Sequence, residues 1–108
     1  MLNSKQRAYL RSRANSVHPV FQVGKGSVGD SMCRSIADAL DARELIKISV
    51  LENAAGTARE IADQLSDLTR SDVVAVIGRK IILFKPSSRE KNRVISPEVA
   101  KIKPGKPE

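Results

Sequence analysis

Two short apolar runs, residues 20–23 and 45–51, are separated by a helical pattern, and this order constrains the fold more than any other feature. In the second run aliphatic and polar residues alternate, which is typical of a strand with one buried and one wet face. A strand–helix–strand connection of this length joins strands that run parallel, whereas antiparallel neighbours need only a tight turn. The chain is therefore expected to build a sheet that contains a parallel pair.

The remaining patterns continue the alternation of helices and strands. A first helix is predicted from Asn3 or Ser4 to about Ala14, and a third helix follows Thr57, whose capping box is completed by Glu60. Two apolar runs flank a tight turn at residues 78–80 and predict a β-hairpin.

The predicted order is α-β-α-β-α-β-β, which indicates an α/β protein of the α+β, two-layer kind. Its four-stranded mixed sheet needs the apolar stripes of the helices for cover. We expect one domain over residues 1–86. From residue 87 to residue 108 the chain is rich in proline and charge and poor in apolar residues, so a mostly disordered basic tail is predicted.

Positive charge is distributed unevenly along the chain, whose formal net charge is +7. Residues 1–28 carry five basic side chains and no acidic one, residues 29–70 carry a net charge of −3, and the remainder is again basic. An asymmetric basic surface is typical of nucleic-acid binding. The single cysteine, Cys33, cannot form an internal disulfide, and no apolar run reaches 18 residues. We therefore expect a cytoplasmic protein without a membrane span.

A glycine-rich turn follows the first predicted strand and opens the second helix, an arrangement that attracts phosphate. Gly24, Gly26 and Gly29 spell the dinucleotide-binding pattern G-x-G-x-x-G, and Glu44 follows twenty residues after the first of them. Glu44 precedes the second strand, however, and so is expected at the sheet edge opposite the turn. We expect it to be structural, paired with Arg43 or Lys47.

The alternative is that the turn clamps an RNA backbone. Glycines let the loop approach the sugar and phosphate of the RNA closely. Lys25 supplies a point charge for a phosphate, and Ser27 supplies a hydroxyl that could donate a hydrogen bond. The first helix carries basic residues with no nearby acid, which favours phosphate contacts. The predicted RNA-binding residues are Gly24, Lys25, Gly26, Ser27, Lys5, Arg7, Arg11, Arg13, Arg79 and Lys80.

Three segments closely resemble the CRM domain family (chloroplast RNA splicing and ribosome maturation), in particular its small bacterial YhbY-type members. They are residues 4–11, residues 20–27 together with 42–48, and the hairpin strands at 76–78 and 83–86. The resemblance implies a fold similar to the C-terminal domain of translation initiation factor 3. It also implies binding to RNA, with association to precursors of the large (50S) ribosomal subunit. The family's G-x-x-G loop corresponds to residues 24–27, where Ser27 replaces the second glycine.

Other site chemistry is weakly supported by the sequence. His18 has no companion histidine, and Cys33 lies within an apolar stripe, so neither supports a metal site. No spacing indicates a catalytic triad. We therefore expect a non-enzymatic, monomeric RNA-binding protein without a cofactor, which acts on large-subunit ribosomal RNA. The alternatives are a small nucleotide-binding protein that uses the same loop and a ribosome-associated factor that contacts mainly protein.

Overall fold

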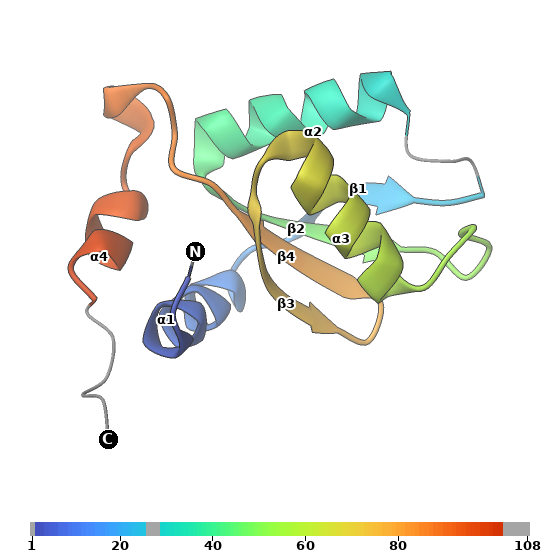
Figure 1. Ribbon diagram of the computed structural model, residues 1–108, viewed down its shortest axis with the longest axis horizontal. Coiled ribbons are helices and arrows are strands. Elements are labelled where there is room, and N and C mark those ends of the chain that lie inside the picture. The colour runs from blue at the N-terminus through green and yellow to red at the C-terminus, as the bar shows by residue number, and fades with distance from the viewer. Residues whose placement is uncertain (1, 26–28, 103–108) are drawn as a thin grey trace.

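The computed structural model describes residues 2–25 and 29–102, and its helices and strands follow the predicted order (Figure 1). The strands predicted at residues 20–23 and 45–51 are observed to within one residue at either end, and the first and third helices begin where their caps predict. The elements are α1 (Ser4–Ala14), β1 (Pro19–Val23), α2 (Asp30–Arg43), β2 (Leu45–Val50), α3 (Ala58–Thr69), β3 (Asp72–Ile77), β4 (Lys80–Phe84), the 3-10 helix η1 (Glu90–Asn92) and α4 (Ser96–Ala100).

The four strands form one mixed sheet in the order β1-β2-β4-β3. β1 and β2 are parallel, as the strand–helix–strand order predicts, and β4 is antiparallel to both β2 and β3. The β3–β4 hairpin turns at Gly78, whose φ of +58° is accessible to glycine at little cost. The predicted fold class, with its four-stranded mixed sheet and covering helices, is confirmed.

Helices cover both faces of this sheet, which adds a third layer to the predicted two. Successive residues of β4 alternate between two cores: Ile81 and Leu83 pack with residues of α2 and α3, whereas Ile82 and Phe84 pack on the opposite face. α1 covers that opposite face, and α4 lies beside α1 at the side of the sheet, where Ile95 and Val99 join the same core (Figure 1). The face of β2 predicted to be wet is consequently largely covered, and Ser49 is buried.

Local capping explains where two helices begin. Asn3 accepts a hydrogen bond from the backbone N–H of Gln6 at 2.8 Å, and the Gln6 side chain accepts one from the N–H of Asn3 at 3.0 Å. Thr57 and Glu60 form the same reciprocal pair at the start of α3, as predicted. These caps satisfy N–H groups that have no partner within the helix.

The expectation of a mostly disordered tail is wrong for residues 87–102, which we call the C-terminal segment. It contains η1 and α4, and the side chains of Ile95 and Val99 are buried in the core under α1. The prediction from composition failed because the segment is poor in apolar residues, and composition does not show that two of them are buried in the core. Residues 103–108 lie outside the described residues.

In the described ranges of the chain, no helix combines the length and apolar character that crossing a membrane requires.

Candidate nucleic-acid interface

The predicted glycine turn leaves the carboxyl end of β1 beside the loop that follows β2. The backbone N–H of Leu51 donates to the carbonyl of Val23 at 2.8 Å, which joins the two segments. A Cβ at Gly24 would lie 3.4 Å from Leu51 Cδ1 and 3.5 Å from Asn53 Oδ1, so the backbone approaches this loop closely. Lys25, the next residue, is exposed. Gly26 and Ser27 lie outside the described residues.

The hairpin turn places Arg79 and Lys80 at the same end of the sheet as Lys25. The N–H of Val50, the last residue of β2, donates to the carbonyl of Arg79 at 2.7 Å. Arg79 forms an exposed ion pair with Glu52 at 3.2 Å, which offsets part of its charge. Lys80 donates to Ser49 Oγ at 2.7 Å and remains an exposed cation. The sheet therefore gathers three of the predicted cationic side chains at one end.

The other predicted cations lie on α1, on the opposite side of the sheet from α2 and α3. Lys5, Arg7, Arg11 and Arg13 are all exposed. Arg13 donates to the hydroxyl of Tyr9 at 3.3 Å, with its guanidinium carbon 6.0 Å from the ring centroid. Within residues 2–25 and 29–102, no ion pair involves these four side chains. Their charge is consequently available to an outside partner.

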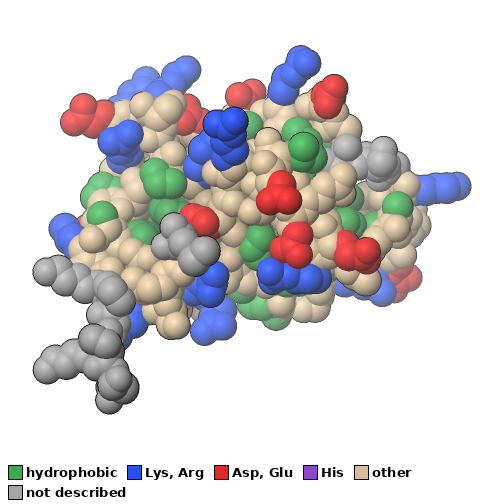
Figure 2. Space-filling view, in the orientation of Figure 1, with side chains coloured by type: hydrophobic (Ala, Val, Ile, Leu, Met, Phe, Trp, Pro, Cys, Tyr) green, Lys and Arg blue, Asp and Glu red, His purple; other side chains and the backbone are tan. Residues whose placement is uncertain are grey.

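The structure does not merge the two groups of cations into one patch. Along the longest axis of the molecule, α1 lies toward one end, and the glycine turn and the β3–β4 hairpin lie toward the other (Figure 1). Acidic side chains gather over α3 on the face seen in Figure 2, consistent with Glu60, Asp63 and Asp67 of that helix. Close to α3 these acidic side chains would repel a polyanion, which the two cationic groups would attract.

Glu44 has a role that the sequence did not predict. Its side chain is fully buried at the junction of α2 and β2, with a φ of +67°, and it pairs with neither Arg43 nor Lys47. Instead its carboxylate accepts hydrogen bonds from four backbone N–H groups of the C-terminal segment. The donors are Ser87 at 2.8 Å, Val94 at 3.0 Å, Ile95 at 2.9 Å and Ser96 at 3.0 Å.

These hydrogen bonds keep Glu44 ionised. Burial acts to raise its pKa, but the hydrogen bonds from Ser96, Ser87 and Ile95 outweigh burial and hold the pKa below the usual glutamate range. The position of Glu44 also argues against the dinucleotide interpretation. It lies at the amino end of β2, and because β1 and β2 are parallel, the glycine turn is at the opposite edge. A ribose held at the turn would be out of its reach.

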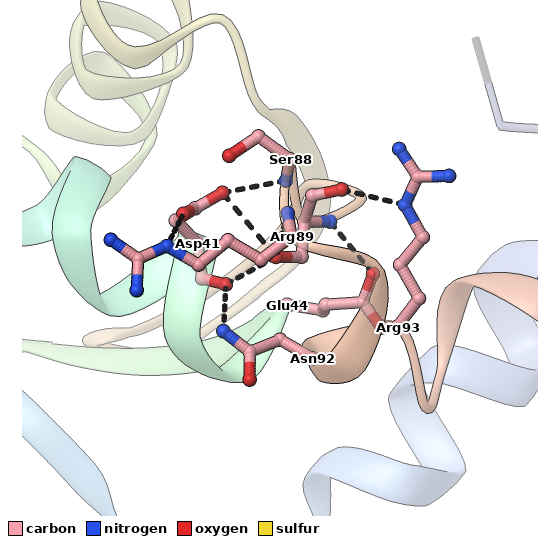
Figure 3. Close-up of polar contacts among 7 residues, drawn as sticks. Asp41, Glu44, Ser88, Arg89, Asn92 and Arg93 are labelled. Atoms are coloured by element: carbon pink, nitrogen blue, oxygen red, sulfur yellow. Dashed lines mark hydrogen bonds and ion pairs between the residues drawn. The ribbon is translucent and has the colours of Figure 1, made fainter.

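Asp41, at the end of α2, is a second acceptor for the C-terminal segment. Its carboxylate accepts from the N–H of Ser88 at 2.6 Å, and Arg89 lies 3.8 Å away (Figure 3). Hydrogen bonds from Ser88, then the hydroxyl of Ser87 and the charge of Arg89, lower the pKa of Asp41 against a partial effect of burial. No sequence pattern indicated the role of either carboxylate, because their partners are more than 40 residues away along the chain.

His18 and Cys33, which the sequence did not support as metal ligands, can also be placed. His18 is exposed, and Cys33 is half-buried against the core shared with α2 and α3. Over the part of the chain that the structure describes, no group of three or more His, Cys, Asp or Glu side chains is arranged to hold a metal ion. A shallow polar hollow of about 340 Å³ opens between α2 and η1, lined by Asp38, Asp41, Ala42, Arg89 and Asn92.

A small mixed sheet, an exposed lysine after its first strand and a helix whose cations form no ion pair with the other described residues together define an α/β domain suited to bind a polyanion. The CRS1/YhbY (CRM) domain model matches residues 2–85. The chain belongs to this family, as the resemblance in its sequence implied.

Relatives from several organisms match most of the chain. The probable RNA-binding protein YqeI of Bacillus subtilis is 48% identical over 91 residues, which are 84% of this chain and 95% of YqeI. A probable RNA-binding protein of Methanocaldococcus jannaschii is 31% identical over 94% of this chain and 77% of its own length, a match that extends into the C-terminal segment. The solution structure of a hypothetical Staphylococcus aureus protein has a TM-score of 0.70 and 44% identity, and covers 83% of this chain and 94% of that one.

Proposed function

We propose that this protein binds structured RNA, namely ribosomal RNA in precursors of the large (50S) subunit, and assists assembly of that subunit in the cytoplasm. It acts by binding rather than by catalysis. The glycine turn around Lys25 and the cationic helix α1 contact phosphates. The proposal combines the geometry of this chain with the names of its relatives, several of which are called RNA-binding proteins.

The observation that carries the proposal is the set of exposed cations on α1. Lys5, Arg7, Arg11 and Arg13 point into solvent without an ion-pair partner among the described residues. Charged side chains on a surface helix are commonly balanced by acidic neighbours three or four residues away. Here residues 1–28 contain no acid at all. Phosphates of a nucleic acid supply the missing partner.

The small number of aromatic side chains favours structured RNA over an unstructured single strand. Stacking on unpaired bases needs exposed rings. Phe84 is buried and Phe21 is half-buried against the core, while Tyr9 is half-buried and contacts Arg13. Recognition therefore rests on the RNA backbone and its shape, which suits folded ribosomal RNA. The assignment to the large subunit comes from the family resemblance.

The first test is the salt dependence of binding to deproteinised large-subunit ribosomal RNA. Each phosphate contact releases counterions, so the affinity should fall steeply as salt rises, with a slope of roughly 0.9 per contact for a duplex. Filter binding from 50 to 300 mM salt measures the slope. An affinity that stays flat across this range contradicts the proposal.

The second test reverses one charge at the glycine turn. Lys25→Glu should weaken RNA binding by about tenfold, because it removes one contact and adds a repulsion. Lys91→Glu, on η1, is the matched control, with an equal change of charge far from the turn. If both variants are folded and weaken binding equally, net charge alone is responsible and the turn is not a contact.

Further measurements address the rival functions. A thermal-shift screen with NAD, ATP and GTP tests nucleotide binding, and a large shift without RNA affinity would reverse the choice. In cells, crosslinking followed by sequencing of the attached RNA identifies the bound element, and co-sedimentation with ribosomal precursors tests the assembly role. If RNase treatment does not release the protein from those particles, protein contacts hold it there instead.

A further inference from the structure

The C-terminal segment lies outside the residues matched by the family model, yet it is fixed to the domain at both ends. At its first end the buried carboxylate of Glu44 accepts the four backbone hydrogen bonds described above, in the surroundings that Figure 3 shows. One side chain thereby fixes the backbone at two places, residue 87 and residues 94–96. A charged acceptor makes these bonds stronger than bonds between neutral groups.

Asp41 and the end of α2 reinforce this first attachment. The backbone carbonyl of Asp41 accepts from Ser87 Oγ at 2.5 Å and from the Asn92 side-chain amide at 3.3 Å. Within the segment, Arg93 Nε donates to the carbonyl of Ser87 at 2.8 Å, which closes the turn around Glu44. These contacts hold η1 against α2.

At its second end the segment is attached to α1. The side-chain amide of Gln6 donates to the carbonyl of Val99 at 3.0 Å and to that of Ile102 at 3.3 Å. The carbonyl of Val99 lies in the last turn of α4 and also accepts from the backbone N–H of Ile102, whereas Ile102 itself lies just beyond the helix. Ile95 and Val99 are buried in one cluster with Leu2 and Leu10. Gln6 also completes the cap of α1, so one side chain serves both helices.

α1 depends on this support because it buries little of its own surface. Leu10 and Ala14 are the buried residues of the helix, and Leu2 precedes it. An isolated helix of 11 residues is marginal in water, so packing decides whether it is ordered. The sheet supplies one contact surface for α1, and α4 supplies another.

We infer that the C-terminal segment positions α1 for RNA binding, with Glu44 as the residue that fixes the segment. The inference rests on the proposed function, because it assumes that the cations of α1 contact RNA. Glu44 itself touches no RNA in this arrangement, since its carboxylate is buried. It acts through the backbone of residues 87–96, through α4, and finally through Gln6 and the apolar cluster.

The test compares Glu44→Gln with Glu90→Gln in the full chain. Both substitutions remove one negative charge, and Glu90 is exposed at the start of η1. By charge alone each variant should bind a polyanion slightly more tightly. If the segment positions α1, Glu44→Gln should instead bind deproteinised large-subunit ribosomal RNA about threefold or more weakly. Its salt slope should fall by about one, as expected for the loss of one phosphate contact, while Glu90→Gln keeps its slope.

Amide hydrogen exchange reports whether the segment and α1 are released. In Glu44→Gln, exchange should accelerate at residues 87–102 and in α1, while the four strands stay protected. Val99→Asp provides a second route, because it places a charge in the contact between α4 and α1 and leaves Glu44 intact. The losses of RNA-binding free energy caused by the two substitutions should not add in the double variant, since both release the same segment. If Glu44→Gln fails to fold, Val99→Asp decides the question.

The possible failures can be told apart with one further variant, Arg7→Gln with Arg11→Gln. If this pair leaves RNA affinity unchanged, α1 is not a contact and that part of the proposed function is wrong. If Arg7→Gln with Arg11→Gln weakens RNA binding, but Glu44→Gln and Val99→Asp release the segment without weakening it, the inference alone is overturned. It is also overturned if residues 87–102 exchange faster while α1 keeps its protection.

Discussion

Glu44 combines two properties that rarely occur together in a stable structure. It is a buried carboxylate that lacks an ion pair among the described residues, and its φ of +67° lies in a region that costs a non-glycine residue roughly 1 kcal/mol or more. Four backbone N–H groups compensate both costs. Glu44→Gln keeps one acceptor oxygen, but it removes the charge and turns an amide N–H toward backbone donors, two of which, from Ser87 and Ile95, are buried. It should therefore lower the free energy of unfolding by about 3 kcal/mol at pH 7.

The same residue predicts the direction of the pH dependence. Hydrogen bonding lowers the pKa of Glu44 and of Asp41 in the folded protein. A group with a lowered pKa stabilises the fold above its unfolded pKa, about 4.3 for Glu and 3.9 for Asp, and this stabilisation is lost as pH falls through the folded value. The free energy of unfolding should therefore decline below about pH 4.

Urea unfolding at pH 7, 5, 4 and 3 measures this dependence. Glu44→Gln should show a shallower decline between pH 5 and pH 3 than the wild type, because one of the titrating groups is gone. The exposed substitution Glu90→Gln serves as the control and should keep the wild-type profile. Equal profiles for Glu44→Gln and the wild type would mean that the carboxylate contributes nothing to stability in this range.

At the scale of the element, α1 and α4 share the side chain of Gln6, and the two contacts can be separated by substitution. Gln6→Glu keeps the oxygen that caps α1 and adds a negative charge that suits a helix N-terminus. It removes the N–H donors to the carbonyls of Val99 and Ile102. We expect the free energy of unfolding to fall by about 1 kcal/mol, with faster amide exchange at residues 99–102 and unchanged helix content in α1.

Gln22→Glu is the matched control for this prediction. Gln22 is exposed on β1, so the same chemical change there should leave both stability and exchange close to the wild type. If Gln6→Glu behaves like Gln22→Glu, the bonds from Gln6 to α4 are not a significant attachment.

Elements with local signals were predictable from the sequence. Asn3 and the pair Thr57 and Glu60 cap their helices through contacts three residues apart, and the alternation in β2 needs no distant information. α4 has no comparable signal, because it is five residues long and its buried side chains, Ile95 and Val99, are too few to form a pattern. Its order comes from Glu44 and Gln6, 51 and 93 residues away from the atoms they bind.

For the candidate site, the sequence indicated which residue types are exposed but not how they are arranged in space. Residue types and spacing indicated which cations face solvent, and Lys25, Arg79 and the arginines of α1 are indeed exposed. Only the strand order brings the hairpin turn beside the end of β2, and with it Arg79 close to Glu52. The separation of α1 from the glycine turn likewise follows from α1 packing on the opposite face of the sheet.

At the scale of the whole molecule, this separation predicts how the two cationic groups combine. The molecule extends 42 Å along its longest axis, with α1 toward one end and the glycine turn toward the other. Among the described residues no ion pair joins Lys25 to Arg11 or to a common partner, and distant sites that share no partner contribute independently to binding. If one RNA spans both groups, the binding free energies lost in Lys25→Glu and Arg11→Glu should add to within about 0.5 kcal/mol in the double variant.

The salt slope provides an independent check on the same argument, because each lost phosphate contact lowers the slope by roughly 0.9 whichever end it comes from. The double variant should therefore show the sum of the two single reductions. A different result would arise if the two ends bind separate RNA molecules, or if only one of them binds at all. In that case the substitution with the smaller effect would cause no further loss of affinity once the other is present. Filter binding with a single short RNA hairpin would then give the same affinity as with the full ribosomal RNA.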